Sequence, residues 1–231
     1  MLKPNNFLFF LSILFSACVN DPVNFEKSLY LKNGIYFSKN TNKPYNGPVY
    51  SLHATGELKS KGTFKNGKVH GVSNDWYKNK IKKSDLLFVH GKNNGIQTFW
   101  YANGIKMDQG TYISGLREGV WTTWHENGHK QREGKFKADN QDGLWTSWYD
   151  NGNKEEEGSF KYGLMEGTII SWYRNGQKKS ENFYKSGKQH GTRTAWYKNG
   201  EKNYEIKKIN GKMISKKFWN KDGSLKGNSI E

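Results

Sequence analysis

The chain is poor in cysteine and in aliphatic residues. Cys18 is the only cysteine among 231 residues, which excludes internal disulfide bonds and any metal site made of several cysteines. Hydrophobic residues make up only 34% of the chain, although aromatic residues reach 15%, and the mean hydropathy is −0.95. A compact domain of this length normally contains more Leu, Ile and Val. The composition therefore favours an extended structure that is stabilised by aromatic contacts.

Arrangements of residues that carry chemistry are also missing. The sequence has no Ser/His/Asp order, no phosphate-binding loop and no motif of paired carboxylates. His125 and His129 lie four residues apart, but a predicted turn separates them and no carboxylate or cysteine completes a zinc site. We therefore expect a protein that is not an enzyme and that has no metal site and no cofactor.

What the chain does contain is a 24-residue repeat, a period that indicates a repeat architecture. Seven repeats cover 47–214, and 215–231 is a degenerate eighth repeat that we expect to cap the end. Counted from a glycine at position 1, position 6 is usually Trp, position 7 is Tyr or His, position 9 is usually Asn, position 12 is usually Lys and position 18 is usually aromatic. The glycines at position 1 are Gly47, Gly71, Gly95, Gly119, Gly143, Gly167 and Gly191.

Each repeat carries the signature of one β-hairpin. An Asn-Gly pair between β-prone runs is a strong hairpin signal, because a type I′ turn needs a positive φ at both central residues. No repeat shows the 3.6-residue apolar spacing of a helix. The pairs that we expect at these turns are Asn103, Gly104, Asn127, Gly128, Asn151, Gly152, Asn175, Gly176, Asn199 and Gly200.

The predicted fold is all-β: an elongated, single-layer, twisted antiparallel sheet built from consecutive 24-residue hairpins. Adjacent residues of a strand point to opposite faces, so Trp148 and Tyr149 should give the two faces separate aromatic columns. Each hairpin adds two strand spacings, and the ribbon should be about 70–80 Å long. Leucine-rich repeats have a similar period, but their L-x-x-L-x-L pattern is absent.

The N-terminal segment reads as an export signal. An apolar run from Phe7 to Phe15 is followed by Ser16, Ala17 and Cys18, and it is too short for a membrane span. Ser-Ala-Cys resembles the lipobox of bacterial lipoproteins, in which the cysteine is acylated, although Phe15 stands where that family usually has Leu. We expect a signal peptide over 1–17, a lipid anchor on Cys18, a tether over 18–28 and a hairpin over 29–46 that caps the first edge strand.

The pattern G-x-W-x-x-W-Y-x-N-G, with a return strand rich in Glu and Lys, resembles the variant MORN repeat. The resemblance covers about residues 30–225. Bacterial proteins of this type are often lipoproteins, and many carry the label of YwqK-type toxin–antitoxin antitoxins. The resemblance implies a single-layer sheet with a binding or scaffolding role and supplies no catalytic residues. The sequence departs from the pattern at Lys80, Leu86, Asp139 and Asn182, where glycine is expected.

The formal net charge is +16, and the lysines at position 12 should form a column. With a two-residue turn this column faces the tyrosines, whereas a change of one residue in loop length sets it beside the tryptophans. Such a strip could bind anionic partners, or it could be a solvated face that keeps the sheet soluble; interleaved acidic residues favour solvation. The candidate binding face is Trp100, Trp124, Trp148, Trp172, Tyr101, Tyr149, Tyr173, Lys106, Lys130, Lys154 and Lys178.

Three functions remain open for an exported protein that is lipid-anchored in the bacterial envelope, facing the periplasm or the outside. The first is a scaffold that docks another protein. The second is a module for cell-wall, glycan or anionic-lipid components. The third is an antitoxin-like neutraliser, which an anchor on Cys18 disfavours because the chain would not easily meet a cytoplasmic toxin. Nucleic acid is an improbable partner for an exported chain.

Overall fold

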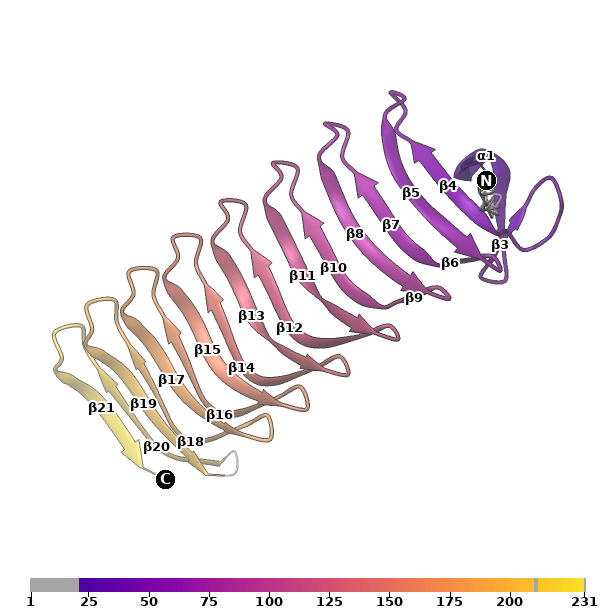
Figure 1. Ribbon diagram of the computed structural model, residues 1–231. Helices are drawn as coiled ribbons and strands as arrows, with labels where there is room; N and C mark the ends of the chain where they lie inside the picture. Colours follow the sequence, from indigo (N-terminus) through magenta and orange to yellow (C-terminus); the bar gives the residue numbers. More distant parts are fainter. Residues whose placement is uncertain (1–20, 210–211, 231) are drawn as a thin grey trace, which may run out of the picture.

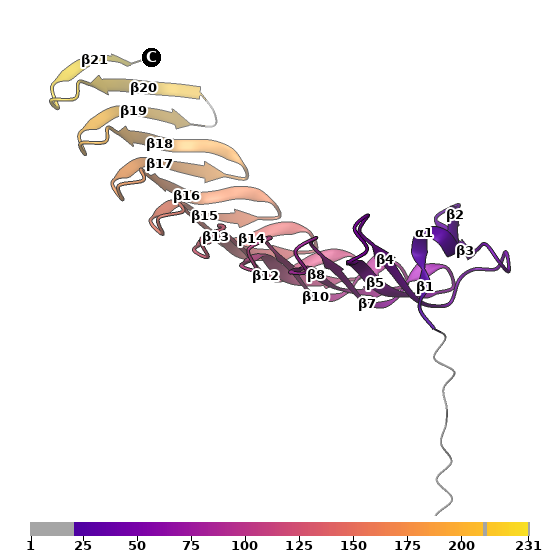
Figure 2. The same ribbon diagram turned by 90° about the horizontal axis from the view of Figure 1, so that it is seen from above.

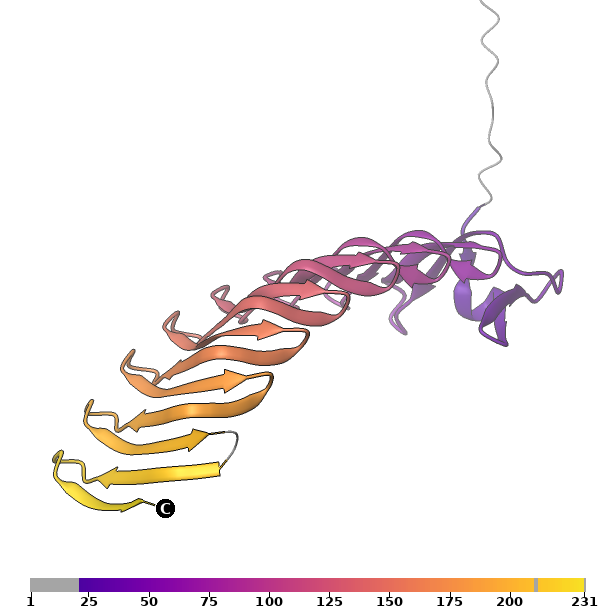
Figure 3. The same cartoon turned by 90° about the horizontal axis from the view of Figure 1, so that it is seen from below.

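The structure is a computed structural model that describes residues 21–209 and 212–230. The predicted signal peptide and Cys18 lie outside the described residues. One long sheet contains nearly all of the strands, which follow one another side by side in chain order (Figure 1). Seen from above and from below, the sheet is a single layer that twists along its length (Figures 2 and 3). The all-β, elongated repeat fold is therefore confirmed.

The described secondary structure consists almost entirely of β-strands. One short helix, α1 (Phe25–Ser28), stands among strands. The strands are β1 (Val23–Asn24), β2 (Leu29–Lys32), β3 (Ile35–Ser38), β4 (Gly47–Leu52), β5 (Leu58–Lys65), β6 (Lys68–Val69), β7 (Gly71–Trp76), β8 (Lys82–Val89), β9 (Lys92–Asn93), β10 (Gly95–Trp100), β11 (Lys106–Ile113), β12 (Leu116–Trp124), β13 (Lys130–Lys137), β14 (Asn140–Trp148), β15 (Lys154–Lys161), β16 (Leu164–Trp172), β17 (Lys178–Lys185), β18 (Lys188–Trp196), β19 (Lys202–Ile209), β20 (Lys212–Trp219) and β21 (Leu225–Ile230).

The Asn-Gly turns form one edge of the sheet (the upper edge in Figure 1), but they are not type I′ turns. Gly152 N–H donates to the carbonyl of Tyr149 over 2.9 Å, and Gly152 has a φ of +85°. Asn151 does not take a positive φ. This is the pattern of a type I turn closed by a left-handed glycine. The expectation of positive φ at both residues of the pair was wrong, because the loop between the paired residues Trp148 and Lys154 is too long for a two-residue turn.

The type I′ turns lie at the opposite edge, where no Asn-Gly signal marks most of them. Tyr162 (φ 54°) and Gly163 (φ 77°) form a two-residue turn between the paired residues Lys161 and Leu164. Ser114 and Gly115 repeat this geometry with φ values of 53° and 92°. Each repeat therefore alternates a long turn at one edge with a tight turn at the other.

The N-terminal cap differs from the expected one. A hairpin of β2 and β3 does form, but it is a separate two-stranded sheet. The edge of β4 is instead paired in parallel by β1, where Val23 lies opposite Val49. Part of the segment expected to be a tether, 18–28, thus folds as β1 and α1. The cap is held by a small core of Leu29, Val49 and Phe64, with Phe25 and Tyr36 packed against it.

The C-terminal end of the sheet is built from the degenerate repeat. Strands β20 and β21 pair as an eighth hairpin, and the turn between them has Gly223 at a φ of +83°. Its Trp219 takes the place that position 6 has in the other repeats, one residue earlier in the count. Within the described residues no strand pairs with the outer edge of β21.

Candidate functional site

The two faces of the sheet carry different side chains. In β14, Thr146 and Trp148 lie on one face, while Trp145 and Ser147 lie on the other. We call the first the Trp face, after the position-6 tryptophans. We call the second the Tyr face, because Tyr149 lines the same groove as Trp145. The Trp face also carries the lysines of position 12 and the acidic residues of position 15, such as Glu157 opposite Thr146.

On the Trp face, the lysine of each repeat extends to the tryptophan of the next one. Lys154 Nζ lies 5.6 Å from the centre of the Trp172 ring and 2.6 Å from a carboxylate oxygen of Glu157. Of the two registers that the sequence left open, the structure therefore has the one that sets lysine beside tryptophan. The same cation–π contact joins Lys82 to Trp100, Lys106 to Trp124, Lys130 to Trp148, Lys178 to Trp196 and Lys202 to Trp219, over 5.3 to 5.8 Å.

The charge of this lysine column is largely compensated. An acidic residue three positions later forms an ion pair with most of these lysines, over 2.6 to 3.1 Å. Lys106 has Gln109 at that place instead. Exposed pairs of this kind contribute little stability each, but they fix the lysine in place and cancel its charge. The column links neighbouring repeats and is a weak attractant for an anion.

The tyrosines of position 7 also link one repeat to the next. Tyr149 Oη donates to the backbone carbonyl of Trp172 over 2.9 Å. His53 and His125 replace Tyr and make the equivalent bond through Nε2, to Trp76 and Trp148. The same bond, over 2.8 to 2.9 Å, joins Tyr77 to Trp100, Tyr101 to Trp124, Tyr173 to Trp196 and Tyr197 to Trp219.

The turn asparagines make a third set of links. Asn151 Oδ1 accepts from the N–H of Asn153, and its Nδ2 donates to the carbonyl of Arg174 in the next turn. Asn79, Asn103, Asn127 and Asn199 make the same pair of bonds. Asparagine therefore serves here because its amide accepts one hydrogen bond and donates another, and not because it tolerates a positive φ. The Asn-Gly pairs therefore shape the turns, but through a turn geometry that differs from the predicted type I′ turn.

A buried aromatic cluster on the Tyr face is made of residues that are not among the predicted site residues. Trp121 and Trp145 are buried at position 3, with Phe136 between them at position 18. Each indole covers the glycine at position 16 of the preceding repeat, and a Cβ on Gly134 would overlap the Trp145 ring. Trp145 Nε1 also donates to the carbonyl of Lys135 over 3.0 Å. The signal was present in the sequence, because tryptophan at position 3 occurs only where glycine fills position 16 one repeat earlier.

A long groove crosses the Tyr face from β10 to β18. It consists of a hollow of about 360 Å³ around Trp121 and a larger one of about 870 Å³ around Tyr149 and Phe160, and the two share Thr123, Arg132 and Trp145. Its floor is aromatic and its walls are charged. Its lining includes Asp108, Arg132, Trp145, Glu155, Glu156, Lys179 and Asn182.

The charged side chains of the groove differ from those of the Trp face. Within the described residues, no ion pair is formed by Asp108, Arg132, Glu156 or Lys179. The Arg132 guanidinium instead lies 4.7 Å from the centre of the Trp145 ring. Burial raises the pKa of Asp108, and nearby Arg117 opposes that rise. These groups are therefore available to a partner.

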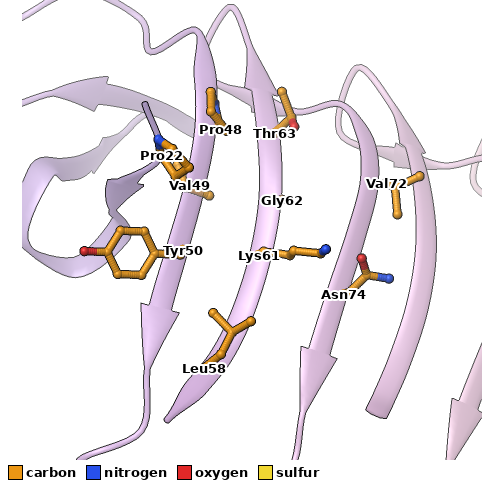
Figure 4. A pocket seen from close by; sticks show the side chains of 10 residues that line it. All are labelled: Pro22, Pro48, Val49, Tyr50, Leu58, Lys61, Gly62, Thr63, Val72 and Asn74. Atoms are coloured by element: carbon orange, nitrogen blue, oxygen red, sulfur yellow. The ribbon is translucent and has the colours of Figure 1, made fainter. Parts of the chain in front are cut away.

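Another hollow, of about 590 Å³, lies at the N-terminal end (Figure 4). Pro22 and Val49 stand next to each other at one side of it, and Leu58 and Val72 complete an apolar lining. The hollow marks the place where the described chain enters the sheet. It contains few polar groups that could fix the orientation of a ligand.

The described residues contain no group of three or more His, Cys, Asp or Glu side chains that could hold a metal ion. His125 and His129 each bond to a backbone carbonyl of the next repeat, of Trp148 and Asp150 respectively. In the part of the chain that the structure describes, no helix combines the length and the apolar character needed to cross a membrane.

Comparison with known proteins gives one family. The family model described as the MORN repeat variant matches residues 45–66, 117–138, 141–162 and 165–186. A search of curated proteins finds no match. Three of the matched segments each span one hairpin with its long turn: β12 and β13, β14 and β15, and β16 and β17.

Proposed function

The chain is a variant MORN-repeat protein, and from this premise we propose that it is a non-catalytic scaffold, lipid-anchored in the bacterial envelope through Cys18, whose Tyr face docks another protein. Sheets of this kind typically act as binding or scaffolding modules. The observation that carries the proposal is the groove of the Tyr face. It combines a buried aromatic floor with charged side chains that have no ion-pair partner in the described part of the chain.

The connection to the anchor supports this arrangement. The described chain joins the sheet at Pro22 and Val23, and β1 pairs with β4. Three residues lie between Cys18 and Pro22, and the four residue-to-residue steps from one to the other span at most roughly 14 Å. An acylated Cys18 would therefore hold the first end of the sheet close to the membrane, while later repeats extend away from that end.

An anionic envelope component is a second candidate, favoured by the net charge of +16. The ion-paired lysines of the Trp face would contribute little to such binding. The mixed signs along the groove also fit a protein better than a polyanion, because electrostatic complementarity needs both signs on the partner. An antitoxin-like role has no separate observation in its favour.

Photocross-linking in native cells tests the proposal. A photoreactive amino acid would replace Glu155 on the Tyr face or, as the matched control, Leu144, which is 57% exposed on the Trp face. We expect a protein adduct from the Glu155 position and a much weaker one from the Leu144 position. Equal labelling from both positions, or labelling only of lipid or glycan, contradicts docking of a protein on the Tyr face.

The anchor has its own test. A Cys18→Ala chain should move from the detergent phase to the aqueous phase and lose labelling by a fatty-acid probe, since acyl chains supply durable membrane attachment. Unchanged membrane fractionation of the Cys18→Ala chain, or a mature protein that begins elsewhere, contradicts the anchor.

A further inference from the structure

The charges along the groove alternate in sign from one repeat to the next. Asp108, Arg132 and Glu156 occupy position 14 of three consecutive repeats, and Lys179 stands at position 13 of the next. They lie on β11, β13, β15 and β17, which are every second strand of the sheet. With about 4.8 Å between adjacent strands, the charges are spaced by about 9.6 Å.

Two buried acceptors at opposite ends of this row lack a donor. Asp108 Oδ1 and Asn182 Oδ1 are buried and make no hydrogen bond within the described residues. Asn182 is only 9% exposed and lines the groove, and its Nδ2 already donates to Ser180. Buried acceptors without a donor are costly and rare. A ligand that supplied N–H groups at both ends would relieve this cost.

The spacing of the charges selects the conformation of a peptide ligand. A polyproline II helix has three residues per turn and rises about 9.3 Å per turn, so every third side chain faces the same way at nearly the spacing of the groove. An α-helix presents one face every seven residues, about 10.5 Å, and accumulates roughly 3 Å of error over three repeats. A β-strand turns every third residue to the opposite face.

The backbone of the ligand leads to the same choice. A polyproline II segment has no internal hydrogen bonds, so its non-proline N–H groups are free to reach Asp108 and Asn182. The N–H groups in the middle of an α-helix are already bonded within the helix. Aromatic-lined grooves are also the common docking sites for polyproline II segments, and Trp121, Phe136 and Trp145 form such a floor here.

We propose that the groove of the Tyr face binds a protein segment of about ten residues in the polyproline II conformation, whose every third residue is charged in the order basic, acidic, basic, acidic from the Asp108 end to the Lys179 end. This inference rests on the proposed protein-docking function and names the chemistry of the segment that is docked. Asp108 and Glu156 bind the basic residues, while Arg132 and Lys179 bind the acidic ones.

Synthetic peptides test the proposal with the purified chain from residue 21 onward. The matched probe is fluorescein-labelled KPAEPAKPAE, and fluorescence anisotropy measures its dissociation constant. Two controls have nearly the same size and the same net charge. KPAKPAEPAE groups the charges, and KGAEGAKGAE lacks the stiffening prolines. We expect each control to bind roughly tenfold more weakly, because the first misplaces two charges and the second loses preorganisation.

A pair of variants locates the site. Arg132→Glu reverses one charge of the groove, and Lys135→Glu makes the same change of net charge three residues away, on the Trp face of the same strand β13. Arg132→Glu should weaken binding of the matched probe roughly tenfold, and Lys135→Glu should have little effect. The peptide KPAKPAKPAE, which places a lysine opposite position 132, should restore binding to Arg132→Glu.

The outcomes separate this inference from the proposed function. Equal affinities for all three probes, equal effects of the two variants, or no binding by the matched probe overturn the inference. If photocross-linking still captures a protein through the Glu155 position, the docking function stands and only the chemistry of the segment is wrong. If neither experiment detects binding on the Tyr face, both are wrong.

Discussion

The two faces of one sheet use the same kinds of side chain for different purposes. On the Trp face, lysine, glutamate and tryptophan contact one another across repeats, so that Lys154 lies both on the Trp172 ring and against Glu157. On the Tyr face, aromatic residues are buried over glycine, and the charged residues Arg132 and Glu156 project beside them without ion pairs in the described chain. The charged side chains of the Trp face are paired with one another, whereas Arg132 and Glu156 on the Tyr face are available to a partner.

This difference arises from the geometry of a single repeat. The long turn ends with a register shift between Ser147 and Trp148, which brings Lys154 opposite Trp148. The position-15 acid then lies three residues beyond the lysine on the same face and can pair with it. On the Tyr face, glycine at position 16 leaves room for an indole, and the cross-strand neighbours of Arg132 are Thr123 and Ser147, which cannot form an ion pair with it.

The largest effect that we expect comes from filling the space under an indole. Gly134→Ala should lower the free energy of unfolding by about 2–3 kcal/mol, because a Cβ at this position overlaps the ring of Trp145 and forces the core of the Tyr face apart. Gly62→Ala is the matched control, since Gly62 holds the same repeat position and faces only Ser73, whose Oγ would lie 3.3 Å from the new Cβ. Urea unfolding measures both.

Equal losses from Gly134→Ala and Gly62→Ala would show that the glycine matters for backbone freedom and not for the indole above it. Neither residue has a positive φ, so the backbone itself accepts alanine at both positions. The comparison therefore isolates the packing of Trp145.

The period of the sequence was sufficient to predict the hairpins, because Gly, Trp, Asn and Lys recur at fixed positions and only a stack of identical units explains that. The register at the long turn could not be predicted, since the same Asn-Gly pair suits either a two-residue turn or a type I turn closed by glycine. This ambiguity decided which aromatic column the lysines would join. Strand β1 could not be predicted either, because Val23–Asn24 is too short to carry a strand pattern.

For the candidate site, the sequence was sufficient to predict the aromatic and lysine columns, but it was not sufficient to predict their roles. Trp148 and Lys154 recur for reasons of stacking, whereas the charges of the groove do not recur at all. Position 14 changes from Asp108 to Arg132 to Glu156, and a search for conserved positions in a repeat passes over a position that varies in this way. A function that depends on differences between repeats is therefore carried by the variable positions, which the repeat pattern does not reveal.

The second prediction concerns the bond that joins neighbouring repeats on the Tyr face. Tyr149→Phe should lower the free energy of unfolding by about 1 kcal/mol, because the carbonyl of Trp172 loses its side-chain donor. Tyr162→Phe is the control, since Tyr162 is 73% exposed at a tight turn. Hydrogen exchange should show faster opening of β14 and β16 in Tyr149→Phe alone. Equal exchange in the two variants contradicts a role for this bond in linking the repeats.

The third prediction compares one lysine from each face. Lys154→Met should cost about 0.5 kcal/mol, because it removes the ion pair with Glu157 while keeping most of the apolar stem. Lys179→Met should cost almost nothing, since within the described residues Lys179 has only a distant contact with the ring of Tyr173, at 5.9 Å. High salt should reduce the first effect by screening. A larger cost for Lys179→Met would mean that charges of the groove are structural.

The smallest effects should have opposite signs on the two faces when the pH changes. Burial raises the pKa of Asp108 above its ordinary value of 3.8, so folding favours its protonated form. The stability that this group contributes is fully present below pH 3.8 and is lost as the pH rises through the pKa of the folded state. Asp108→Asn keeps the shape without the charge, and it should be more stable than the parent chain near neutral pH and equal to it at low pH.

On the Trp face, the hydrogen bond from Lys130 lowers the pKa of Glu133 below 4.5, despite partial burial, so folding favours its charged form. That stability is present above pH 4.5 and is lost as the pH falls through the pKa of the folded state. Glu133→Gln should therefore be less stable near neutral pH, and the difference should also vanish in acid. Urea midpoints at about pH 7 and about pH 3 measure both differences, and two differences of the same sign would contradict the contrast between an open face and a closed one.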